Sequence, residues 1–364
     1  MRKVDLESPV PKYYQIKDIL KEMILSGKLK EGEKLDTCRK MAEDFETTYL
    51  TINHAIGLLD KEKLIRRVQG KGIFVDKKEL KPLIPRKVHA LMTYRGEVYG
   101  DIFSSFLAAM DKTDFRIEAT DLLSFNNLSY AEQEERLNSI MSGGPLNLLI
   151  DGDYSFPLKL LAKQIDKINQ ITFIHRYEKD FRLDGVNYIL TDYFNAGYSV
   201  GKHLISKGHT RILFITFGYP PKSATPKWIE GTYHHDIGRG IQAAMKEHGL
   251  DDSRFSVILE NSPDRNERLA SYLKNNKFPG ILCCGDFLVL DVYNLAFQNK
   301  LEIGKDLSVA GFFNTGLAQK FSPALTSVSI NADELGRLAA ETIKNDDRNK
   351  NISVKTKLVI RQSA

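Results

Sequence analysis

The amino-acid sequence predicts an α/β protein in two parts, a short helical region that ends in a β-hairpin and a longer region with two open sheets. In the first part, helical apolar patterns are followed by two short apolar strands around Lys71. In the second part, apolar strands alternate with amphipathic helices from Val88 onward, and the alternation begins again after Asp192. Such alternation is typical of parallel sheets with helices on both faces, so we expect two lobes.

Three helices are expected before the hairpin. The first ends before Ser26 and Gly27, because glycine commonly terminates a helix. Its apolar positions follow helical spacing, at Tyr13, Ile16, Leu20, Met23 and Ile24. A short second helix is expected at residues 37–45, and Thr48 can cap a third. The predicted buried stripe of the third helix consists of Ile52, Ala55, Ile56 and Leu59.

Residues 64–75 form the predicted hairpin, with Gly70 and Gly72 on either side of the basic tip at Lys71. Three helices followed by such a hairpin predict a winged helix-turn-helix, in which the first turn of the third helix enters the major groove of DNA. The glycines let the wing backbone approach DNA closely. A solvated hairpin is the alternative interpretation of the wing alone. The expected base-reading residues are Tyr49, Thr51 and Asn53, and the expected phosphate contacts are Arg66, Arg67 and Lys71.

Short motifs in residues 10–76 strengthen this interpretation. They are Tyr14-Gln15-Ile16, Ile24-Leu25-Ser26-Gly27-Lys28-Leu29, Gly32-Glu33-Lys34-Leu35, Met41-Ala42-Glu43 and Gln69-Gly70-Lys71-Gly72-Ile73-Phe74-Val75. Together they resemble a GntR-type DNA-binding domain. The family usually has Pro-Ser-Glu-Arg where this chain has Asp36-Thr37-Cys38-Arg39, so the resemblance carries over Arg39 alone as a DNA contact. Tyr49 and Asn53 replace two usual arginines, so a different operator sequence is expected. The full set of expected DNA-binding residues is Arg39, Thr48, Tyr49, Thr51, Asn53, Arg66, Gln69, Gly70 and Lys71.

The composition is that of an ordinary globular protein. The 364 residues are 42% apolar, and no segment has the length and apolar character of a membrane span. Residues 1–7 lack the apolar core of a signal peptide, and the three cysteines have no disulfide or zinc spacing, so a cytoplasmic location is expected. Residues 1–81 contain 18 Lys and Arg against 14 Asp and Glu, which is +4 of the chain's formal +5. This distribution fits a localised nucleic-acid footprint.

The domain boundaries follow from a charged segment with two prolines. A linker is expected at residues 77–87, between a DNA-binding domain at 1–76 and a second domain at 88–364. In the first lobe, strands are expected at residues 88–92, 115–121, 146–150 and 171–174, and helices at 99–111, 130–142 and 157–169. In the second lobe, strands are expected at 212–215, 256–259, 280–283 and 309–312, and helices around 200–204, 239–249, 269–275 and 288–298.

Polar side chains directly follow several of these strands. Ligands of open α/β sheets bind beyond the carboxyl ends of the strands, so an effector site is expected between the lobes. Charged planar groups there can form paired hydrogen bonds with a hydroxyl-rich ligand. For each residue, a solvated loop charge or a salt bridge is the alternative interpretation. The candidates are Tyr94, Arg95, Asp151, Asp153, His175 and Arg176.

A second set of motifs lies in residues 87–364. It comprises Asp192, the run 203–212, Gly240-Ile241-Gln242-Ala243-Ala244-Met245, Gly285-Asp286 and the runs 306–312, 323–328, 334–336 and 358–361. These motifs resemble the LacI/GalR effector domain, which is akin to periplasmic sugar-binding proteins. The resemblance implies an effector-binding and dimerisation domain with lobe 1 at about 88–190 and 330–348 and lobe 2 at about 191–329 and 349–364. A GntR-type reader fused to this periplasmic-binding-protein-like domain resembles the arabinose repressor class.

The chain departs from that family at two frequent ligand-holding positions. Ile237 replaces the usual Arg, with Arg239 nearby, and Phe313 replaces the usual acid, followed by Asn314. Asp286 stands at a matching family position. Phe313 can stack on the C–H face of a sugar, although an aromatic residue at a strand end is more often simply packed. The resemblance therefore adds Arg239, Asp286, Phe313 and Asn314 to the expected ligand-binding residues.

Other chemistry is not indicated. His234-His235-Asp236 can suggest a metal site, but adjacent histidines do not easily converge on one ion, and a solvated loop is the favoured interpretation. Residues 143–145 lack the Lys-Ser/Thr of a phosphate loop, and Cys283-Cys284 is expected to pack in a core. No cofactor and no metal are expected.

Two classes of function remain in view. The favoured one is a ligand-responsive transcriptional regulator, a homodimer that binds double-stranded operator DNA and represses a carbohydrate-utilisation operon until a monosaccharide or derivative releases it. The alternative is a sugar-processing enzyme with an N-terminal winged-helix regulatory domain. A sugar kinase would need a glycine-rich phosphate motif, and a pyridoxal-phosphate enzyme would need a Schiff-base lysine in a larger fold. Neither signature is visible in the sequence.

Overall fold

The structure is a computed structural model. It describes residues 11–25, 28–76, 86–94, 96–142, 146–152, 156–177, 183–218, 227–228 and 230–364. The chain divides into two compact units, Met1–Arg86 and Lys87–Ala364, which we call the reader unit and the effector unit. Most of the predicted linker lies outside the described residues. Within the described ranges, no helix combines the length and the apolar character that crossing a membrane requires.

The reader unit contains three helices and one hairpin. The helices are α1 (Lys12–Leu25), α2 (Cys38–Asp44) and α3 (Tyr49–Lys61), and the strands are β1 (Ile65–Val68) and β2 (Gly72–Val75). The strands pair antiparallel, with Ile65 opposite Val75. The predicted stripe of α3 is confirmed, because Ile52, Ala55, Ile56 and Leu59 are all fully buried. They pack against Ile16, Leu20 and Ile24 of α1 in one core. The expected stop signal of α1, Ser26 and Gly27, lies outside the described residues.

The effector unit begins with lobe 1, which is built on a six-stranded sheet. The strand order is β13-β7-β6-β5-β3-β4. The strands are β3 (Arg86–Met92), β4 (Phe115–Asp121), β5 (Leu146–Ile150), β6 (Gln170–His175), β7 (Asn187–Thr191) and β13 (Asn351–Val354). The helices are α4 (Glu97–Met110), α5 (Leu122–Asn126), α6 (Tyr130–Met141), α7 (Leu158–Ala162) and α12 (Ala332–Lys344), with a 3-10 turn at Ile165–Lys167.

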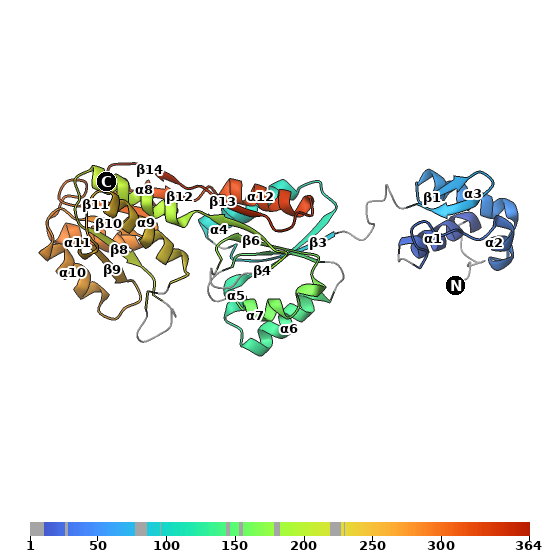
Figure 1. Ribbon diagram of the computed structural model, residues 1–364, viewed down its shortest axis with the longest axis horizontal. Coiled ribbons are helices and arrows are strands. Elements are labelled where there is room, and N and C mark those ends of the chain that lie inside the picture. The colour runs from blue at the N-terminus through green and yellow to red at the C-terminus, as the bar shows by residue number, and fades with distance from the viewer. Residues whose placement is uncertain are drawn as a thin grey trace. The chain divides into compact units, whose positions relative to one another are not determined.

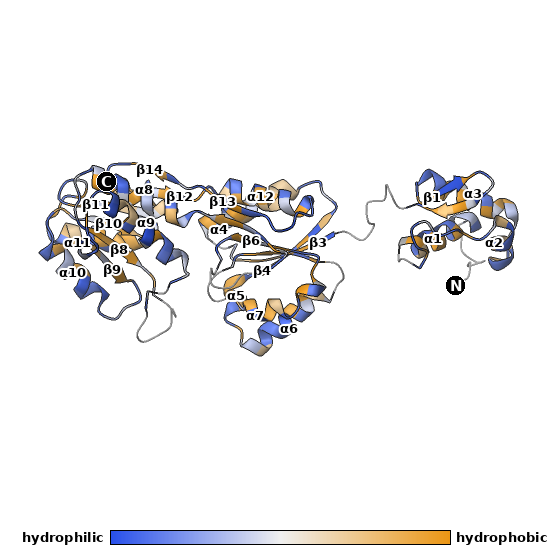
Figure 2. Cartoon of the chain, in the orientation of Figure 1, coloured by the Kyte–Doolittle hydropathy of each residue, from blue (hydrophilic) through white to orange (hydrophobic). Residues whose placement is uncertain are grey.

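Apolar side chains cover both faces of this sheet, and all five residues of β5 are buried. Leu149 joins a core that contains residues of α4 and α12. Leu148 and Ile150 join a second core with residues of α5, α6 and α7. Figure 1 shows α4 and α12 on one face of the sheet and α5, α6 and α7 on the other. Figure 2 shows the apolar residues concentrated along the strands.

Lobe 2 has a second six-stranded sheet, in the order β14-β12-β11-β10-β8-β9. The strands are β8 (Ile212–Thr216), β9 (Phe255–Leu259), β10 (Gly280–Cys283), β11 (Ser308–Phe312), β12 (Thr326–Ser329) and β14 (Lys357–Val359). The helices are α8 (Tyr193–Ser206), α9 (Tyr233–Glu247), α10 (Arg265–Asn275) and α11 (Val289–Gln298), with 3-10 turns at Asp252–Arg254 and Asp286–Leu288. The ladders from β9 through β8, β10 and β11 to β12 are parallel. The edge strand β14 pairs antiparallel with β12.

The chain passes between the lobes three times, after β7, after β12 and after β13. One predicted boundary is corrected here. Residues 349–364 were expected in lobe 2, but β13 pairs with β7 in the sheet of lobe 1, with Asn351 beside Tyr188. Only β14 and the residues after it return to lobe 2. The reason is that β13 completes the free edge of β7, whose backbone groups would otherwise lack partners.

Candidate DNA-binding surface and effector cleft

The first turn of α3 presents polar side chains away from the core. Thr48 caps the helix, because its Oγ1 accepts a hydrogen bond from the Thr51 backbone N–H at 3.2 Å. The two threonine hydroxyls also lie 2.9 Å apart, so both contribute to this cap. Tyr49 is 51% exposed, and Asn53 lies between the buried positions at Ile52 and Ala55 on the half-exposed side of the helix. This turn can therefore present Tyr49 and Asn53 to a groove.

Leu50 also lies in this turn and is not among the residues expected from the sequence. Its side chain is 76% exposed, although it is apolar and sits between two expected reading residues. An apolar side chain at this position can contact the methyl group of thymine. The signal was present in the sequence, since Leu50 falls outside the buried stripe of α3.

The wing has the expected shape. Gly70 and Gly72 both have positive φ, +73° and +122°, which glycine adopts without strain. The Lys71 N–H donates to the Val68 carbonyl at 3.0 Å and closes the turn, which leaves the Lys71 side chain exposed. Arg66 lies over the Phe74 ring at 5.5 Å and faces Asp76 at 3.7 Å. Gln69 and, on α2, Arg39 are also exposed.

In lobe 1 the predicted strand-end residues form a buried ion pair. Arg176 follows β6 and Asp151 follows β5. The guanidinium donates from Nε to Asp151 Oδ1 at 3.0 Å and from Nη2 to Oδ2 at 2.6 Å. Both residues are at least nine-tenths buried, so the two opposite charges cancel in a bidentate contact.

Two tyrosines extend this pair into an aromatic cluster. The Arg176 guanidinium carbon lies 5.1 Å from the ring centre of Tyr99 on α4 and 5.6 Å from that of Tyr233 on α9. Tyr99 belongs to lobe 1 and Tyr233 to lobe 2, so the cation lies against aromatic faces from both lobes. Neither tyrosine is among the residues expected from the sequence, because each lies in the first turn of a helix and not at a strand end.

Two buried histidines join the cluster in their neutral form. His175 Nδ1 lies 2.9 Å from Thr191 Oγ1, and its Nε2 lies 2.9 Å from the Tyr193 hydroxyl. His234 Nδ1 lies 2.8 Å from Thr216 Oγ1. Burial, with a smaller contribution from the Arg176 charge, lowers the pKa of His175 well below its usual range. The same two causes lower the pKa of His234 to about 3. The cluster therefore carries almost no net charge at neutral pH.

The segment His234-His235-Asp236 requires a correction. It was interpreted as a solvated loop, but it forms the first turn of α9, and His234 and Asp236 are buried. Thr232 caps the helix through the His235 backbone N–H, which explains why the chain turns inward here. Among the residues that the structure describes, no group of His, Cys, Asp and Glu has a geometry suited to a metal ion.

Asp286 is 1% exposed and has its carboxylate fully engaged with protein donors. Its Oδ1 accepts from Ser327 Oγ at 2.6 Å. Its Oδ2 accepts from the Thr315 backbone N–H at 2.7 Å and from the Thr315 hydroxyl at 2.9 Å. Burial raises the pKa of Asp286, and these hydrogen bonds oppose the shift. Asp286 thus shapes the loop after β11.

The structure brings some of the remaining candidates to the cluster and leaves others apart. Phe313 reaches it, with its ring centre 6.4 Å from that of His175. Asn314 lies next to Phe313, but its Oδ1 accepts from Arg361 Nη2 at 2.7 Å. Arg239 does not join the cluster, since its side chain is 56% exposed and lies over Phe194 on the outer face of α8. Tyr94 is 36% exposed and lies beside Phe103. Arg95 and Asp153 lie outside the described residues.

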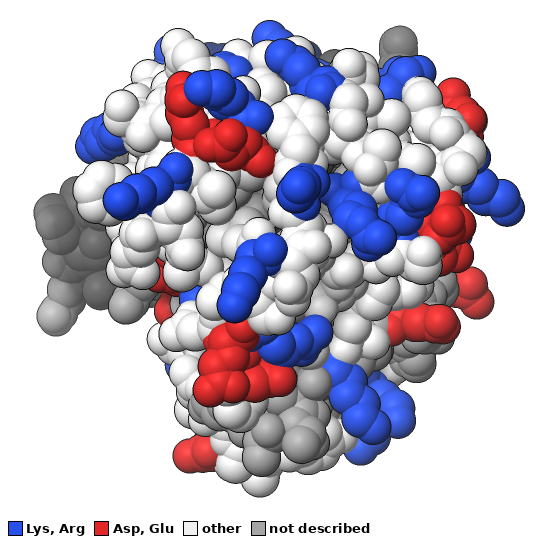
Figure 3. All heavy atoms as spheres, turned by 90° about the vertical axis from the view of Figure 1, so that its left-hand side faces the viewer, with Lys and Arg blue, Asp and Glu red and all other residues white. Residues whose placement is uncertain are grey.

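Figure 3 shows one face of lobe 2, where Lys and Arg are interspersed with Asp and Glu. The cluster around Arg176 is built from residues at the carboxyl ends of β5, β6, β8 and β11.

A winged helix-turn-helix joined to a two-lobed α/β domain defines a DNA-binding regulator with a ligand-binding fold. Residues 12–75 match the family model described as bacterial regulatory proteins, gntR family. Residues 202–364 match the periplasmic binding protein-like domain. The chain therefore contains a gntR-type domain at residues 12–75 and a periplasmic binding protein-like domain at residues 202–364.

Relatives with this type of function are distant in sequence. The arabinose metabolism transcriptional repressor of Geobacillus stearothermophilus is 22% identical over 372 residues, which covers 98% of each chain. The ribose operon repressor of Haemophilus influenzae is 27% identical over 216 residues, which covers 54% of this chain and 62% of the relative.

Solved structures share the fold of the effector unit. A LacI family transcriptional regulator from Enterococcus faecium with bound ribose has a TM-score of 0.54 at 16% identity and covers 77% of this chain and 98% of its own. A complex of the transcriptional regulator CelR with cellobiose has a TM-score of 0.59 at 15% identity and covers 91% of this chain and all of its own.

Proposed function

We propose that the protein is a homodimeric repressor whose operator affinity is lowered by a small neutral sugar or sugar derivative bound between the lobes. The observation that supports this most strongly is the aromatic cluster around the Asp151–Arg176 pair. It offers aromatic faces and fixed polar groups while its charges cancel, and its histidines are neutral. Aromatic faces suit the C–H surface of a sugar ring, and a site with no net charge favours an uncharged ligand.

Dimerisation is part of the proposal for a geometric reason. One recognition helix covers only a half-site, so a paired site requires two readers related by two-fold symmetry. The names of the relatives support the repressor role, because the two described above are repressors of arabinose metabolism and of a ribose operon. We further propose that the protein acts in the cytoplasm and catalyses no reaction.

The test begins without a known ligand. Thermal unfolding of the full chain against a panel of monosaccharides identifies the effector, because a ligand that binds the folded state raises the midpoint by mass action. Selection from a random DNA pool identifies the operator. We expect the effector to weaken operator binding by about 5-fold to 150-fold, and the operator to weaken effector binding by the same factor. A sugar that shifts the midpoint without changing DNA affinity would contradict the proposal.

A further inference from the structure

Four consecutive backbone amides after β11 each donate to a different residue. We call residues 313–316 the cleft loop. Phe313 N–H donates to the Val328 carbonyl at 2.7 Å, and Asn314 N–H donates to Ser327 Oγ at 3.0 Å. These two acceptors lie on β12 of the same lobe. The next amide, that of Thr315, donates to Asp286, which also belongs to lobe 2.

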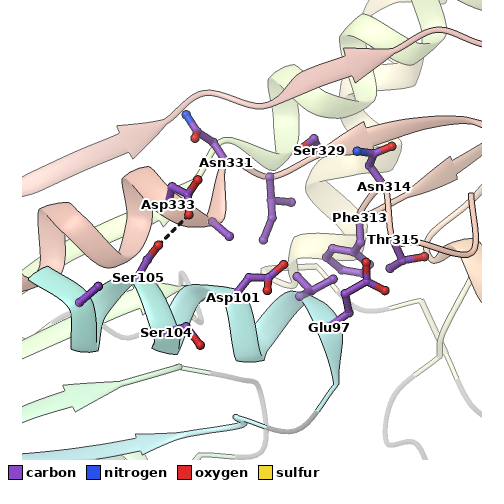
Figure 4. Close-up of a pocket in the computed structure, with 14 residues that line it drawn as sticks. Glu97, Asp101, Ser104, Ser105, Phe313, Asn314, Thr315, Ser329, Asn331 and Asp333 are labelled. Atoms are coloured by element: carbon purple, nitrogen blue, oxygen red, sulfur yellow. Dashed lines mark hydrogen bonds between the residues drawn. The ribbon is translucent and has the colours of Figure 1, made fainter. Parts of the chain in front are cut away.

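The fourth amide reaches the other lobe. Gly316 N–H donates to Glu97 Oε1 at 2.6 Å, and Glu97 lies in the first turn of α4 in lobe 1. Three of the four amides of the cleft loop thus donate to acceptors in lobe 2, and the fourth donates to a single carboxylate of lobe 1. Figure 4 shows Glu97 at the end of α4 with its carboxylate directed toward Thr315 and Phe313.

The loop needs these contacts because its backbone is unfavourable. Phe313 has a φ of +90° and Asn314 has a φ of +49°. Residues other than glycine rarely adopt positive φ. Such conformations persist when the surroundings determine them strongly, and they concentrate at ligand sites and switches. The conformation here places the Phe313 ring beside His175 of lobe 1. Loss of the hydrogen bond from Gly316 N–H to Glu97 therefore weakens the restraint on Phe313.

The same region offers a matched comparison residue. Asp101 lies one turn after Glu97 on α4 and lines the same pocket, which has a volume of about 520 Å³ and lies between α4, the cleft loop and the start of α12. Figure 4 shows Asp101 facing this pocket. Within the described part of the chain, Asp101 makes no hydrogen bond to lobe 2, whereas Glu97 does.

We propose that Glu97 is a positioning residue that links lobe closure to the shape of the cleft loop, and so sets effector affinity without contacting the effector. The second half of this statement rests on the proposed function, whereas the first half concerns the protein without ligand. With the lobes as the structure has them, Glu97 holds Gly316 and the loop presents Phe313 to the cleft. When the lobes separate, the amide loses its acceptor and the loop is free to relax.

The first experiment needs no ligand. Hydrogen–deuterium exchange of the full chain is followed at the Gly316 amide in the parent, Glu97→Ala, Glu97→Gln and Asp101→Asn. Loss of the acceptor in Glu97→Ala should speed exchange about threefold to tenfold, since the bond is exposed and a charged acceptor adds to its strength. Glu97→Gln keeps a carbonyl acceptor and should lie between Ala and the parent. Asp101→Asn should match the parent. Unchanged exchange in Glu97→Ala, or equal acceleration in Asp101→Asn, would overturn the proposed contact.

The second experiment uses the sugar identified by thermal unfolding. Calorimetric titration should show about threefold to tenfold weaker binding to Glu97→Ala, while Asp101→Asn binds as the parent does. Faster Gly316 exchange with unchanged affinity would overturn the link to the effector. If no sugar binds the parent, the proposed function fails, whereas the exchange experiment still decides the role of Glu97. Because Glu97 is exposed, both variants should fold, and circular dichroism checks this.

Discussion

At the scale of single residues, the DNA-binding surface separates two kinds of contact. Tyr49 and Asn53 lie at the start of α3, which we expect to enter the groove, whereas Lys71 lies at the tip of the wing. Base contacts discriminate between sequences, and phosphate contacts do not. Substitution of the first group should therefore weaken binding to operator more than to random DNA, whereas substitution of Lys71 should weaken binding to both.

We expect Asn53→Ala and Tyr49→Ala to cost about 1 to 3 kcal/mol of discrimination between operator and random DNA. Lys71→Ala should weaken both DNAs alike and reduce the salt dependence by about one phosphate contact. Fluorescence anisotropy at several salt concentrations measures both effects. Equal losses of Asn53→Ala on operator and random DNA would count against a base-reading role.

Asp286 was expected from the sequence to hold the ligand. In the structure its oxygens accept hydrogen bonds from Thr315 and Ser327, so its loss should also affect stability. We expect Asp286→Ala to lower the free energy of unfolding of the effector unit by about 1 to 3 kcal/mol, because three donors lose their acceptor. Urea unfolding measures this, with Asp286→Asn as the milder variant. A variant of parental stability that no longer binds the sugar would instead favour direct ligand contact.

At the scale of elements, glycines let α8 and α9 approach closely in lobe 2. A Cβ atom at Gly197 would lie 1.9 Å from the Ile237 carbonyl oxygen, and one at Gly240 would lie 2.1 Å from that of Phe194. Backbone atoms cannot move aside as a flexible side chain can, so the helices must separate. The glycines therefore determine the position of α9, whose first turn carries Tyr233 and His234.

We expect Gly197→Ala to lower the free energy of unfolding of the effector unit by about 1 to 3 kcal/mol or more. Gly57→Ala on α3 is the matched control, because a Cβ atom there meets nothing within 4 Å. The control variant should have a reader unit as stable as that of the parent, or more stable by up to about 1 kcal/mol, since alanine favours a helix. Thermal melts of the two variants compare them directly, and a Gly197→Ala melt like that of the parent would refute close packing here.

At the scale of the whole molecule, buried neutral histidines make stability depend on pH. Burial lowers the pKa of His89 to about 4 and that of His234 to about 3, and it lowers the pKa of His175 as well. Each pKa is lower in the folded than in the unfolded chain, so the unfolded chain binds more protons below the ordinary value of about 6.5. The contribution of these histidines to the free energy of unfolding is therefore fully present above that pH and decreases below it.

We expect the effector unit to lose up to about 1.4 kcal/mol per pH unit for each such histidine between about pH 6.5 and pH 4. Urea unfolding at a series of pH values gives this slope. His234→Gln should reduce the slope by about one histidine, because glutamine does not titrate. If His234→Gln leaves the slope of the free energy of unfolding against pH unchanged, His234 does not contribute to that slope.

The fold was predictable where local patterns carry it. The bounds of β4, β5 and β10 match the predictions, because β5 and β10 are largely apolar and β4 alternates apolar and polar residues. No helix was expected at residues 332–344, where α12 contains Gly336. In the structure it allows α4 to approach, since a Cβ atom there would lie 2.6 Å from the Ile102 carbonyl oxygen. Strands β13 and β14 are short and partly exposed, so they have no apolar run to detect.

The site was predictable only in part for a related reason. Asp151, His175 and Arg176 follow strands, and the geometry of parallel sheets places strand ends together. Tyr99, Tyr233 and Glu97 act across the gap between two lobes, so their proximity depends on how the chain passes between the lobes. No local pattern encodes such contacts.

The late return of the chain to lobe 1 has a consequence for its synthesis. As the ribosome extends the polypeptide, β7 emerges long before β13, its partner at the sheet edge. Helix α12, which covers the same lobe, also comes late. A nascent lobe 1 therefore has an open strand edge and an uncovered apolar face until residues 332–354 have been translated. Exposed edges of this kind are prone to wrong pairing, so the newborn chain should depend on chaperones until residues 332–354 have emerged.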